Sequence, residues 1–237
     1  MSGHSKWANI KHKKAKEDAK RGHTFTKIIK EITVCAKNGG IPENNPQLRQ
    51  LIEKAKEANM PGDNITRAVK KGTGELPGVS YEAISYEGYG PGGTAVIIEA
   101  LTDNKNRTVA DLRHIFARHN GNLAETGAVN WMFDKLGVIR GTIAGKTEDD
   151  LLEALMDYDV QDISTEDNLV SVNTGMASLF QIKDALVKLG MKVESAELEW
   201  IAKNNLDVDA ETEEKAFTLF EALEDNDDVQ NVYSNLH

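Results

Sequence analysis

Apolar residues in the first third of the chain recur every three or four positions, the spacing that places them on one face of a helix. Three such stripes occur before residue 75, and glycine or polar turn residues follow each of them. Short helices of this kind gain stability mainly by packing their stripes together. The pattern predicts a helical bundle whose stripes are Phe25, Ile28, Ile29, Ile32 and Ala36, then Leu48, Leu51, Ile52, Ala55 and Ala58, then Ile65, Ala68 and Val69.

Strand and helix patterns alternate from a glycine- and proline-containing linker at residues 72–78 to the end of the chain. From about residue 138 to residue 200 the expected order of elements is β-α-β-β-α-β, which is typical of a ferredoxin-like unit. The last helix and the last strand are left without a partner in that unit. The predicted strands cover residues 81–86, 94–101, 129–133, 138–143, the regions of 162 and 169, 191–200 and 229–233.

An unpartnered helix and strand cannot bury their apolar faces alone, so we expect the last two elements to return to the sheet begun by residues 80–132. The predicted fold class is α+β. An N-terminal helical bundle precedes two α+β domains, of which the third is ferredoxin-like and inserted into the discontinuous second. The predicted domains are residues 1–75, residues 80–132 together with 206–237, and residues 133–205.

Charge divides the chain in the same place as the hydrophobic pattern. Residues 1–75 contain 16 Lys and Arg against 8 Asp and Glu, whereas the rest contains 12 against 30. A basic module joined to an acidic body is typical of a protein that binds a polyanion at one end. No apolar run is long enough to cross a membrane or to act as a signal peptide, and the single cysteine excludes an internal disulfide. We therefore expect a cytoplasmic protein without a membrane partner.

The positive charge is densest near the N-terminus. Lys13, Lys16 and Lys20 share one face of a helix expected over residues 10–20, and stacked like charges destabilise an isolated helix. A polyanionic partner explains that arrangement. Trp7 fits either stacking on a base or packing against the bundle, of which packing is the more common. The nucleic-acid-binding residues predicted here are Lys6, Trp7, Lys11, Lys13, Lys14, Lys16, Lys20 and Arg21.

A second candidate phosphate contact lies at the start of the helix expected after residue 104. Lys105 and Arg107 flank Asn106 there, so free backbone amides and two cations occur together. The alternative is an ordinary helix cap, formed by Asn104 or Asn106, with solvated neighbours.

Four long stretches of the sequence resemble the YebC-type family: SGHSKWANIKHKKAKEDAKRGHTFTKIIKEI, NMPGDNITRAVKKG, YEGYGPGGTAVIIEALTDNKNRTVADLRHIF and NLAETGAVNWMF. The resemblance runs from residue 1 to about residue 135. It implies a three-domain α+β protein of a family described as probable DNA-binding transcriptional regulators, which also includes mitochondrial translational activators of cytochrome oxidase. One departure is Gly62, where relatives often carry a charged residue.

Catalytic and metal-binding patterns are weak, so we predict neither an enzyme nor a cofactor. The glycine-rich loop at residues 88–93 opens a strand and lacks the lysine of a phosphate-binding loop. His114 and His119 are turned about 140° apart on a helix, which does not form a zinc site. We expect a DNA-binding transcriptional regulator, with an RNA- or ribosome-bound translation factor as the alternative. The acidic C-terminal body is a further candidate surface for a protein partner.

Overall fold

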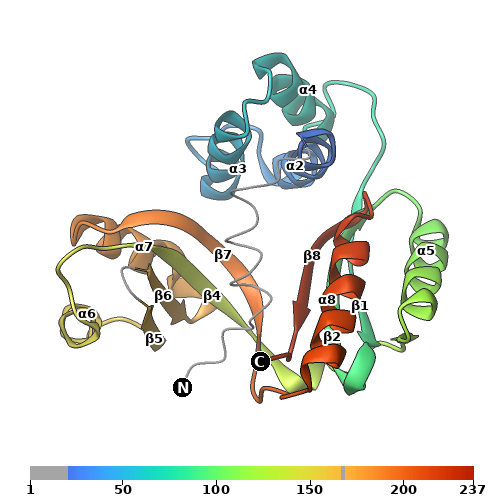
Figure 1. The fold of residues 1–237 in the computed structure, drawn as a ribbon. Helices are drawn as coiled ribbons and strands as arrows, with labels where there is room; N and C mark the ends of the chain where they lie inside the picture. Colours follow the sequence, from blue (N-terminus) through green and yellow to red (C-terminus); the bar gives the residue numbers. More distant parts are fainter. Residues whose placement is uncertain (1–20, 167–168) are drawn as a thin grey trace.

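The computed structural model describes residues 21–166 and 169–237, which form a mixed α+β protein (Figure 1). This part of the chain contains seven α-helices and two four-stranded antiparallel sheets, as expected for the α+β class. The helix expected over residues 10–20 lies outside the described residues. None of the described helices combines the length and the apolar character that a membrane crossing requires.

The N-terminal bundle contains helices α2 (Arg21–Cys35), α3 (Pro46–Glu57) and α4 (Gly62–Gly72). The predicted stripes meet in its core, where Ile32 and Leu48 are fully buried. Asn45 caps α3 by accepting a hydrogen bond from the amide of Leu48. At Gly72 a Cβ atom would lie 2.4 Å from the carbonyl oxygen of Thr33, so glycine is needed where α4 crosses α2.

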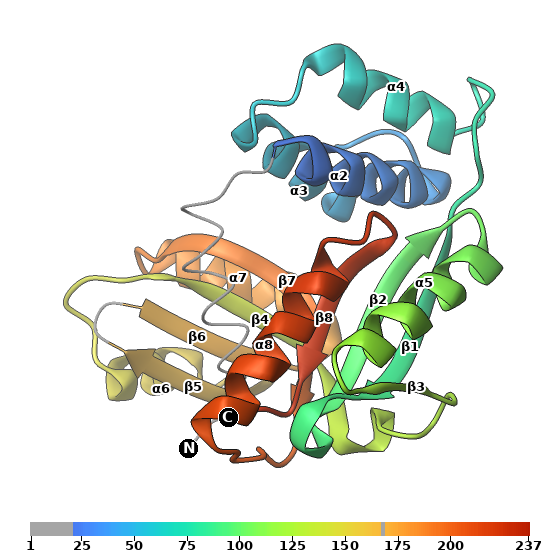
Figure 2. The same ribbon diagram turned by 45° about the vertical axis from the view of Figure 1, so that its right-hand side comes forward.

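The first sheet has the strand order β3-β1-β2-β8, with two helices covering one face (Figure 2). Val96 and Ile98 of β2 pack on that face against Phe116 and Phe220 of the two helices. Because β2 is buried on both faces, it is apolar nearly throughout. The elements are β1 (Glu82–Tyr89), β2 (Ala95–Thr102), α5 (Lys105–Arg118), β3 (Asn122–Ala124), α8 (Ala210–Glu224) and β8 (Val229–Ser234).

The second sheet has the strand order β5-β6-β4-β7, and all its neighbouring strands are antiparallel. Its core packs the inward residues of the sheet, such as Ile139, against Leu151 and Ile182 of two helices. Thr147 and Asp150 form the expected capping box at the start of the first helix. The elements are β4 (Phe133–Thr142), α6 (Glu148–Leu155), β5 (Val160–Glu166), β6 (Leu169–Thr174), α7 (Leu179–Lys188) and β7 (Lys192–Ala202).

The chain leaves the first sheet after Met132 and returns towards it at Lys203, and these two residues are neighbours in space. The amide of Lys203, just after β7, donates a hydrogen bond of 2.9 Å to the carbonyl of Met132, just before β4. Strand β8 then pairs antiparallel with β2, and Val96 lies opposite Ser234. A segment of about seventy residues therefore begins and ends at adjacent positions.

Glu99 of β2 links the two sheets. Its carboxylate accepts hydrogen bonds from Lys135 Nζ of β4 at 2.8 Å, from Trp200 Nε1 of β7 at 3.1 Å and from Tyr233 Oη of β8 at 3.3 Å. Burial, together with the nearby carboxylates of Glu99 and Glu199, raises the pKa of Tyr233 well above its usual value. These contacts join β4 and β7 to the face of β2 that α5 and α8 leave open.

The strand predicted over residues 129–133 is wrong. This segment is a loop followed by one turn of 3-10 helix (Asn130–Met132), and β4 begins only at Phe133. The carboxylate of Glu87 accepts hydrogen bonds from the amides of Gly127, Val129 and Asn130, so the backbone turns around that side chain. Val129, Met132 and Phe133 pack instead between the two sheets, whereas Trp131 is exposed.

Candidate nucleic-acid interface

Most of the predicted nucleic-acid contacts, Lys6, Trp7, Lys11, Lys13, Lys14, Lys16 and Lys20, lie outside the described residues. Arg21 is the first residue of α2, so the basic segment joins the body at this helix. Lys105 and Arg107 lie in the first turn of α5. The structure therefore describes the attachment point of the basic segment and the second candidate phosphate contact.

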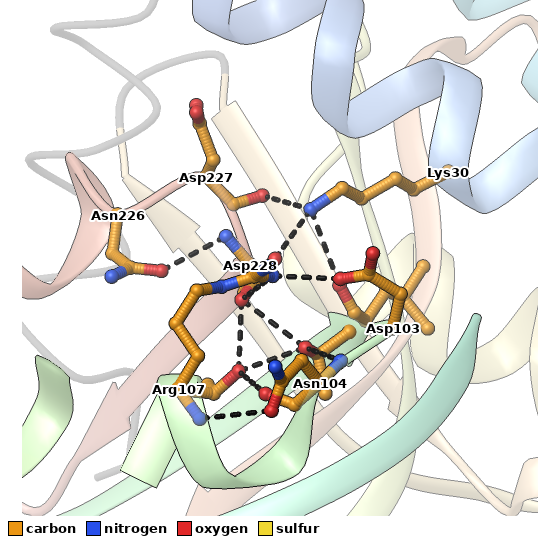
Figure 3. Close-up of polar contacts among 10 residues, drawn as sticks. Lys30, Asp103, Asn104, Arg107, Asn226, Asp227 and Asp228 are labelled. Atoms are coloured by element: carbon orange, nitrogen blue, oxygen red, sulfur yellow. Dashed lines mark hydrogen bonds and ion pairs between the residues drawn. The ribbon is translucent and has the colours of Figure 1, made fainter. Parts of the chain in front are cut away.

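A buried carboxylate, that of Asp228, holds α2 against the first sheet (Figure 3). Lys30 of α2 is also buried, and its Nζ lies 2.7 Å from Asp228 Oδ1. The same ammonium group donates hydrogen bonds to the carbonyls of Asp227, at 2.8 Å, and Leu101, at 3.4 Å. All three contacts of Lys30 are thus made with the start of β8 and the end of β2.

The second oxygen of Asp228 binds the start of α5. Asp228 Oδ2 accepts hydrogen bonds from Arg107 Nη2 at 2.9 Å, from Thr108 Oγ1 at 2.8 Å and from Thr102 Oγ1 at 3.2 Å. Burial alone would raise the pKa of this carboxyl, but the bonds from Lys30, Arg107 and Thr108 lower the pKa to about 2. Asp228 is therefore a charged hub between α2, α5 and β8.

The two cations predicted as a second phosphate contact have carboxylate partners. Arg107 Nη2 lies 2.9 Å from Asp228 Oδ2 and 2.7 Å from Asp103 Oδ1. These two carboxylates raise the pKa of Arg107. Lys105 pairs with Glu82 of β1 at 2.7 Å. The cap is Asn104, whose side chain accepts a hydrogen bond from the amide of Arg107. The geometry matches a capped helix start whose cations hold neighbouring strands.

Lys27, one turn before Lys30, fixes the start of α2. Its Nζ donates a hydrogen bond of 2.7 Å to the carbonyl of Glu224, at the end of α8. The last turn of α8 contains no basic residue of its own, so this lysine supplies the cation that a helix C-terminus favours. Arg21 lies six residues earlier, roughly 9 Å along the helix axis. The basic segment therefore joins α2 roughly 9 Å from the contact between Lys27 and the end of α8.

A basic cluster on α4 was missed in the sequence analysis. Arg67, Lys70 and Lys71 are exposed, and none of them forms an ion pair within residues 21–166 and 169–237. Their spacing of three and four places them close together on the helix, and that spacing was the signal available in the sequence. Helix α4 is the part of the bundle farthest from the two sheets (Figure 1). We call these three residues the α4 cluster.

Two family models together cover nearly the whole chain. The TACO1/YebC N-terminal domain matches residues 5–75, and the TACO1/YebC second and third domain matches residues 81–236. The chain belongs to the TACO1/YebC family.

Relatives of this TACO1/YebC protein match over its full length. Two proteins named "Probable transcriptional regulatory protein", from Geotalea uraniireducens and Thermoanaerobacter pseudethanolicus, are each 52% identical. The alignments cover 99% and 100% of this chain, and 95% and 97% of the relatives. The crystal structure of a conserved hypothetical protein from Aquifex aeolicus is 44% identical, with a TM-score of 0.87 over 98% of this chain and 97% of that one.

In the described part of this TACO1/YebC protein, no group of three or more His, Cys, Asp or Glu side chains is arranged to hold a metal ion. Cys35 is buried in the bundle, and its thiol donates a hydrogen bond of 3.6 Å to the side chain of Asn45. Burial raises the pKa of this thiol, which favours the unreactive protonated form.

We expect Cys35→Ala to leave nucleic-acid affinity unchanged, because the thiol packs in the bundle core. The same change removes one of the hydrogen-bond partners of Asn45 and part of a small buried side chain, so it should cost roughly 1 kcal/mol of stability. Urea denaturation measures the stability, and titration of duplex DNA measures the affinity. A large loss of affinity with unchanged stability would contradict a packing role.

Proposed function

We propose that this TACO1/YebC protein is a non-enzymatic regulator of gene expression that binds nucleic acid through its basic N-terminal module. The α4 cluster is the observation that carries this proposal, because it is exposed, forms no ion pair within residues 21–166 and 169–237, and belongs to the helix that lies farthest from the two sheets (Figure 1). The N-terminal residues from Lys6 to Arg21 supply further cations. The names of the relatives, probable transcriptional regulatory proteins, support the same function.

The contacts we propose are with phosphates rather than base edges. In base-specific reading, Arg or Lys contacts guanine and Asn or Gln contacts adenine, whereas a phosphate contact needs only a positive charge such as the lysine ammonium. The segment before α2 is rich in lysine, and the α4 cluster contains two lysines and one arginine. Duplex DNA is the target that the names of the relatives suggest. Structured RNA would present the same phosphates, so the test includes both.

We also propose a domain division that places the basic module at one end: residues 1–75, then 80–132 with 206–237, then a ferredoxin-like domain of residues 133–205. The pairing of β8 with β2 supports the discontinuous second domain. The hydrogen bond between Lys203 and Met132 supports an insertion, because the ends of an inserted domain must meet. The acidic third domain remains a candidate surface for a protein partner.

A salt series tests the phosphate contacts. Each contact changes the slope of log affinity against log salt by about −0.9 on duplex DNA, or about −0.7 on single strands. Changing Arg67, Lys70 and Lys71 to Gln, or changing Lys13, Lys16 and Lys20 to Gln, should each flatten the slope by roughly two to three. All sequences should be weakened about equally. Titration of two unrelated DNA duplexes and of ribosomal RNA measures these effects.

The matched control changes Lys146, Lys188 and Lys192 to Gln. These lysines are exposed on the second sheet and its helices, far along the chain from the basic module, and the loss of charge is identical. We expect this variant to keep nearly the original slope. An unchanged slope in both basic variants, or a loss confined to one sequence, would contradict phosphate contacts by this module.

A further inference from the structure

A cleft of about 680 Å³ lies where the helical bundle meets both sheets. Helices α2 and α3 form one wall, and α7 with β7 forms the other. Strands β1, β2 and β8 form the floor, through residues such as Ser85, Glu99 and Gln230. A hydrogen bond joins the two walls: Gln50 Nε2 of α3 donates to the carbonyl of Ala196 of β7 at 3.0 Å.

The walls of this cleft are predominantly acidic. Glu53 and Glu57 of α3 and Glu194 of β7 line it and are exposed. Glu53 and Glu57 form no ion pair within the described residues, although they are one helical turn apart and close to the C-terminal end of α3. Like charges at this spacing repel each other, and carboxylates oppose the dipole at a helix C-terminus. A cationic occupant would relieve both unfavourable terms.

The lysine nearest to these carboxylates on α3 has other partners. Lys54 Nζ lies 3.2 Å from Glu197 of β7 and 3.7 Å from Glu31 of α2. Desolvation alone would lower the pKa of Lys54, but the two carboxylates raise it. Lys54 therefore reinforces the contact between the two walls and forms its ion pairs with Glu31 and Glu197 rather than with Glu53 or Glu57.

The cleft also offers apolar and amide contacts. Met176, Phe180 and Leu198 line it with exposed fractions of 55%, 39% and 39%. Gln230 lies at the bulge where β8 pairs with β2. Both polar atoms of its carboxamide are buried, and neither has a hydrogen-bond partner within residues 21–166 and 169–237. An unsatisfied buried amide costs roughly 1–3 kcal/mol, so rotation of this side chain towards the backbone donors and acceptors of an occupant would be favourable.

We propose that the occupant is the chain's own basic segment, residues 1–20, and that docking there competes with nucleic acid. The segment contains six lysines against two acidic residues, and it also carries Trp7 and Ile10, which match the apolar part of the cleft. It joins the body at Arg21, on the helix whose residues Glu31 and Val34 line the cleft. Twenty residues span up to roughly 70 Å when extended, so the whole cleft is within reach.

The consequence is autoinhibition by an acidic surface that substitutes for phosphate. Because the segment and the cleft belong to one chain, docking is intramolecular, and an effective concentration in the millimolar range lets even a weak contact be populated. Apparent affinity for nucleic acid falls in proportion to the fraction of undocked chains. This competition rests on the proposed function, whereas the docking itself does not.

A paramagnetic label tests the docking without nucleic acid. Ser5→Cys in a Cys35→Ala background carries a nitroxide near the N-terminus, and amide signals of the body are recorded by NMR. We expect line broadening at Glu53, Glu57 and Glu194 in low salt and its loss in 1 M NaCl, where charges more than about 3 Å apart are screened. Changing Glu53, Glu57 and Glu194 to Gln should also remove it.

Two outcomes of the label experiment would overturn the proposal. The first is the absence of broadening at the cleft in low salt, or broadening confined to another surface. The second is seen in a mixture of two kinds of chain, one that carries the nitroxide but no NMR isotope and one that is isotope-enriched but carries no nitroxide. Broadening that persists in this mixture would show that the contact joins two copies. Intramolecular docking predicts no broadening in that mixture.

Binding measurements test the competition. The variant with Glu53, Glu57 and Glu194 changed to Gln should bind duplex DNA about three- to tenfold more tightly at low salt, the gain expected if docking occupies most chains. The matched control changes Asp149 and Asp157 to Asn and Glu153 to Gln. These residues lie on or beside α6, are exposed and carry the same charge. It should gain less than about twofold.

An equal gain in both variants would assign the effect to net charge and overturn the competition. A failure of every variant to bind nucleic acid would contradict the proposed function instead, and the label experiment would still decide the docking. A gain confined to the cleft variant, together with broadening at the cleft, establishes both parts.

Discussion

A chain that ends at residue 205 is expected to lose the cooperative unfolding transition of the first sheet. The truncation removes α8 and β8, which supply Phe220, Leu219 and Val232 to the fully buried core over β2. Losing one buried phenylalanine side chain costs about 3–5 kcal/mol, and the total stability of a domain is only about 5–15 kcal/mol. The remaining strands cannot compensate, because β2 also loses the neighbour that pairs with it along one edge.

Hydrogen exchange measures this outcome directly. The amides of β2, Ala95–Thr102, should exchange at nearly the rate of an unfolded chain in the truncated protein. A control chain keeps α8 and β8 but replaces residues 134–202 with a short Gly-Ser linker, which is possible because Met132 and Lys203 are hydrogen-bonded neighbours. That chain should retain protection across β2. Protection of β2 in the truncated chain would contradict the discontinuous second domain.

The α+β class could be predicted from the sequence because burial and periodicity coincide in most elements. The stripe containing Ile32 and the stripe containing Leu48 meet in the bundle core, as their spacing indicated. Asn104 and Thr147 cap their helices, which follows from their short polar side chains before an apolar repeat. The expectation that the last helix and strand return to the sheet begun by residues 80–132 came from their unpartnered apolar faces, but the choice of β2 as the partner of β8 is seen only in the structure.

The polar hubs could not be predicted, because periodicity carries no information about which distant side chains meet. Lys30 is one of the 16 basic residues counted in residues 1–75, although it is buried against Asp228, nearly two hundred residues away. Arg107 was considered for phosphate, although the same carboxylate holds it. Glu87 turns residues 127–130 into a loop where apolar residues had suggested a strand. Long-range ion pairs of this kind appear only when the fold is known.

The Asp228 hub leads to the second large effect, because it joins three elements through one buried carboxylate. Asp228→Asn should lower the free energy of unfolding by about 3–5 kcal/mol, the usual cost of removing one partner of a buried ion pair. Lys30 would keep its buried ammonium group while losing the opposing charge. The double variant Lys30→Met with Asp228→Asn should recover part of that loss, because it no longer buries that unpaired cation.

The pH dependence of stability gives an independent readout of the same group. The pKa of Asp228 is about 2 in the folded protein, below the value of about 3.9 for an unfolded chain. Its contribution is therefore fully present above pH 4 and is lost as the pH falls from about 4 towards 2. Asp228→Asn should remove this part of the acid destabilisation, so the difference between the two proteins should be largest at neutral pH and shrink as the pH falls towards 2.

Urea denaturation across this pH range checks the result, with Asp149→Asn as the control because Asp149 is exposed on α6. The control should follow the original protein at every pH. If the free energies of unfolding of Asp228→Asn and of the original protein differed by the same amount from pH 7 to pH 2, Asp228 would not act as a charged residue that joins the three elements. The phosphate contacts that we propose do not include this hub, so Asp228→Asn should also leave the salt slope of nucleic-acid binding unchanged while the protein remains folded.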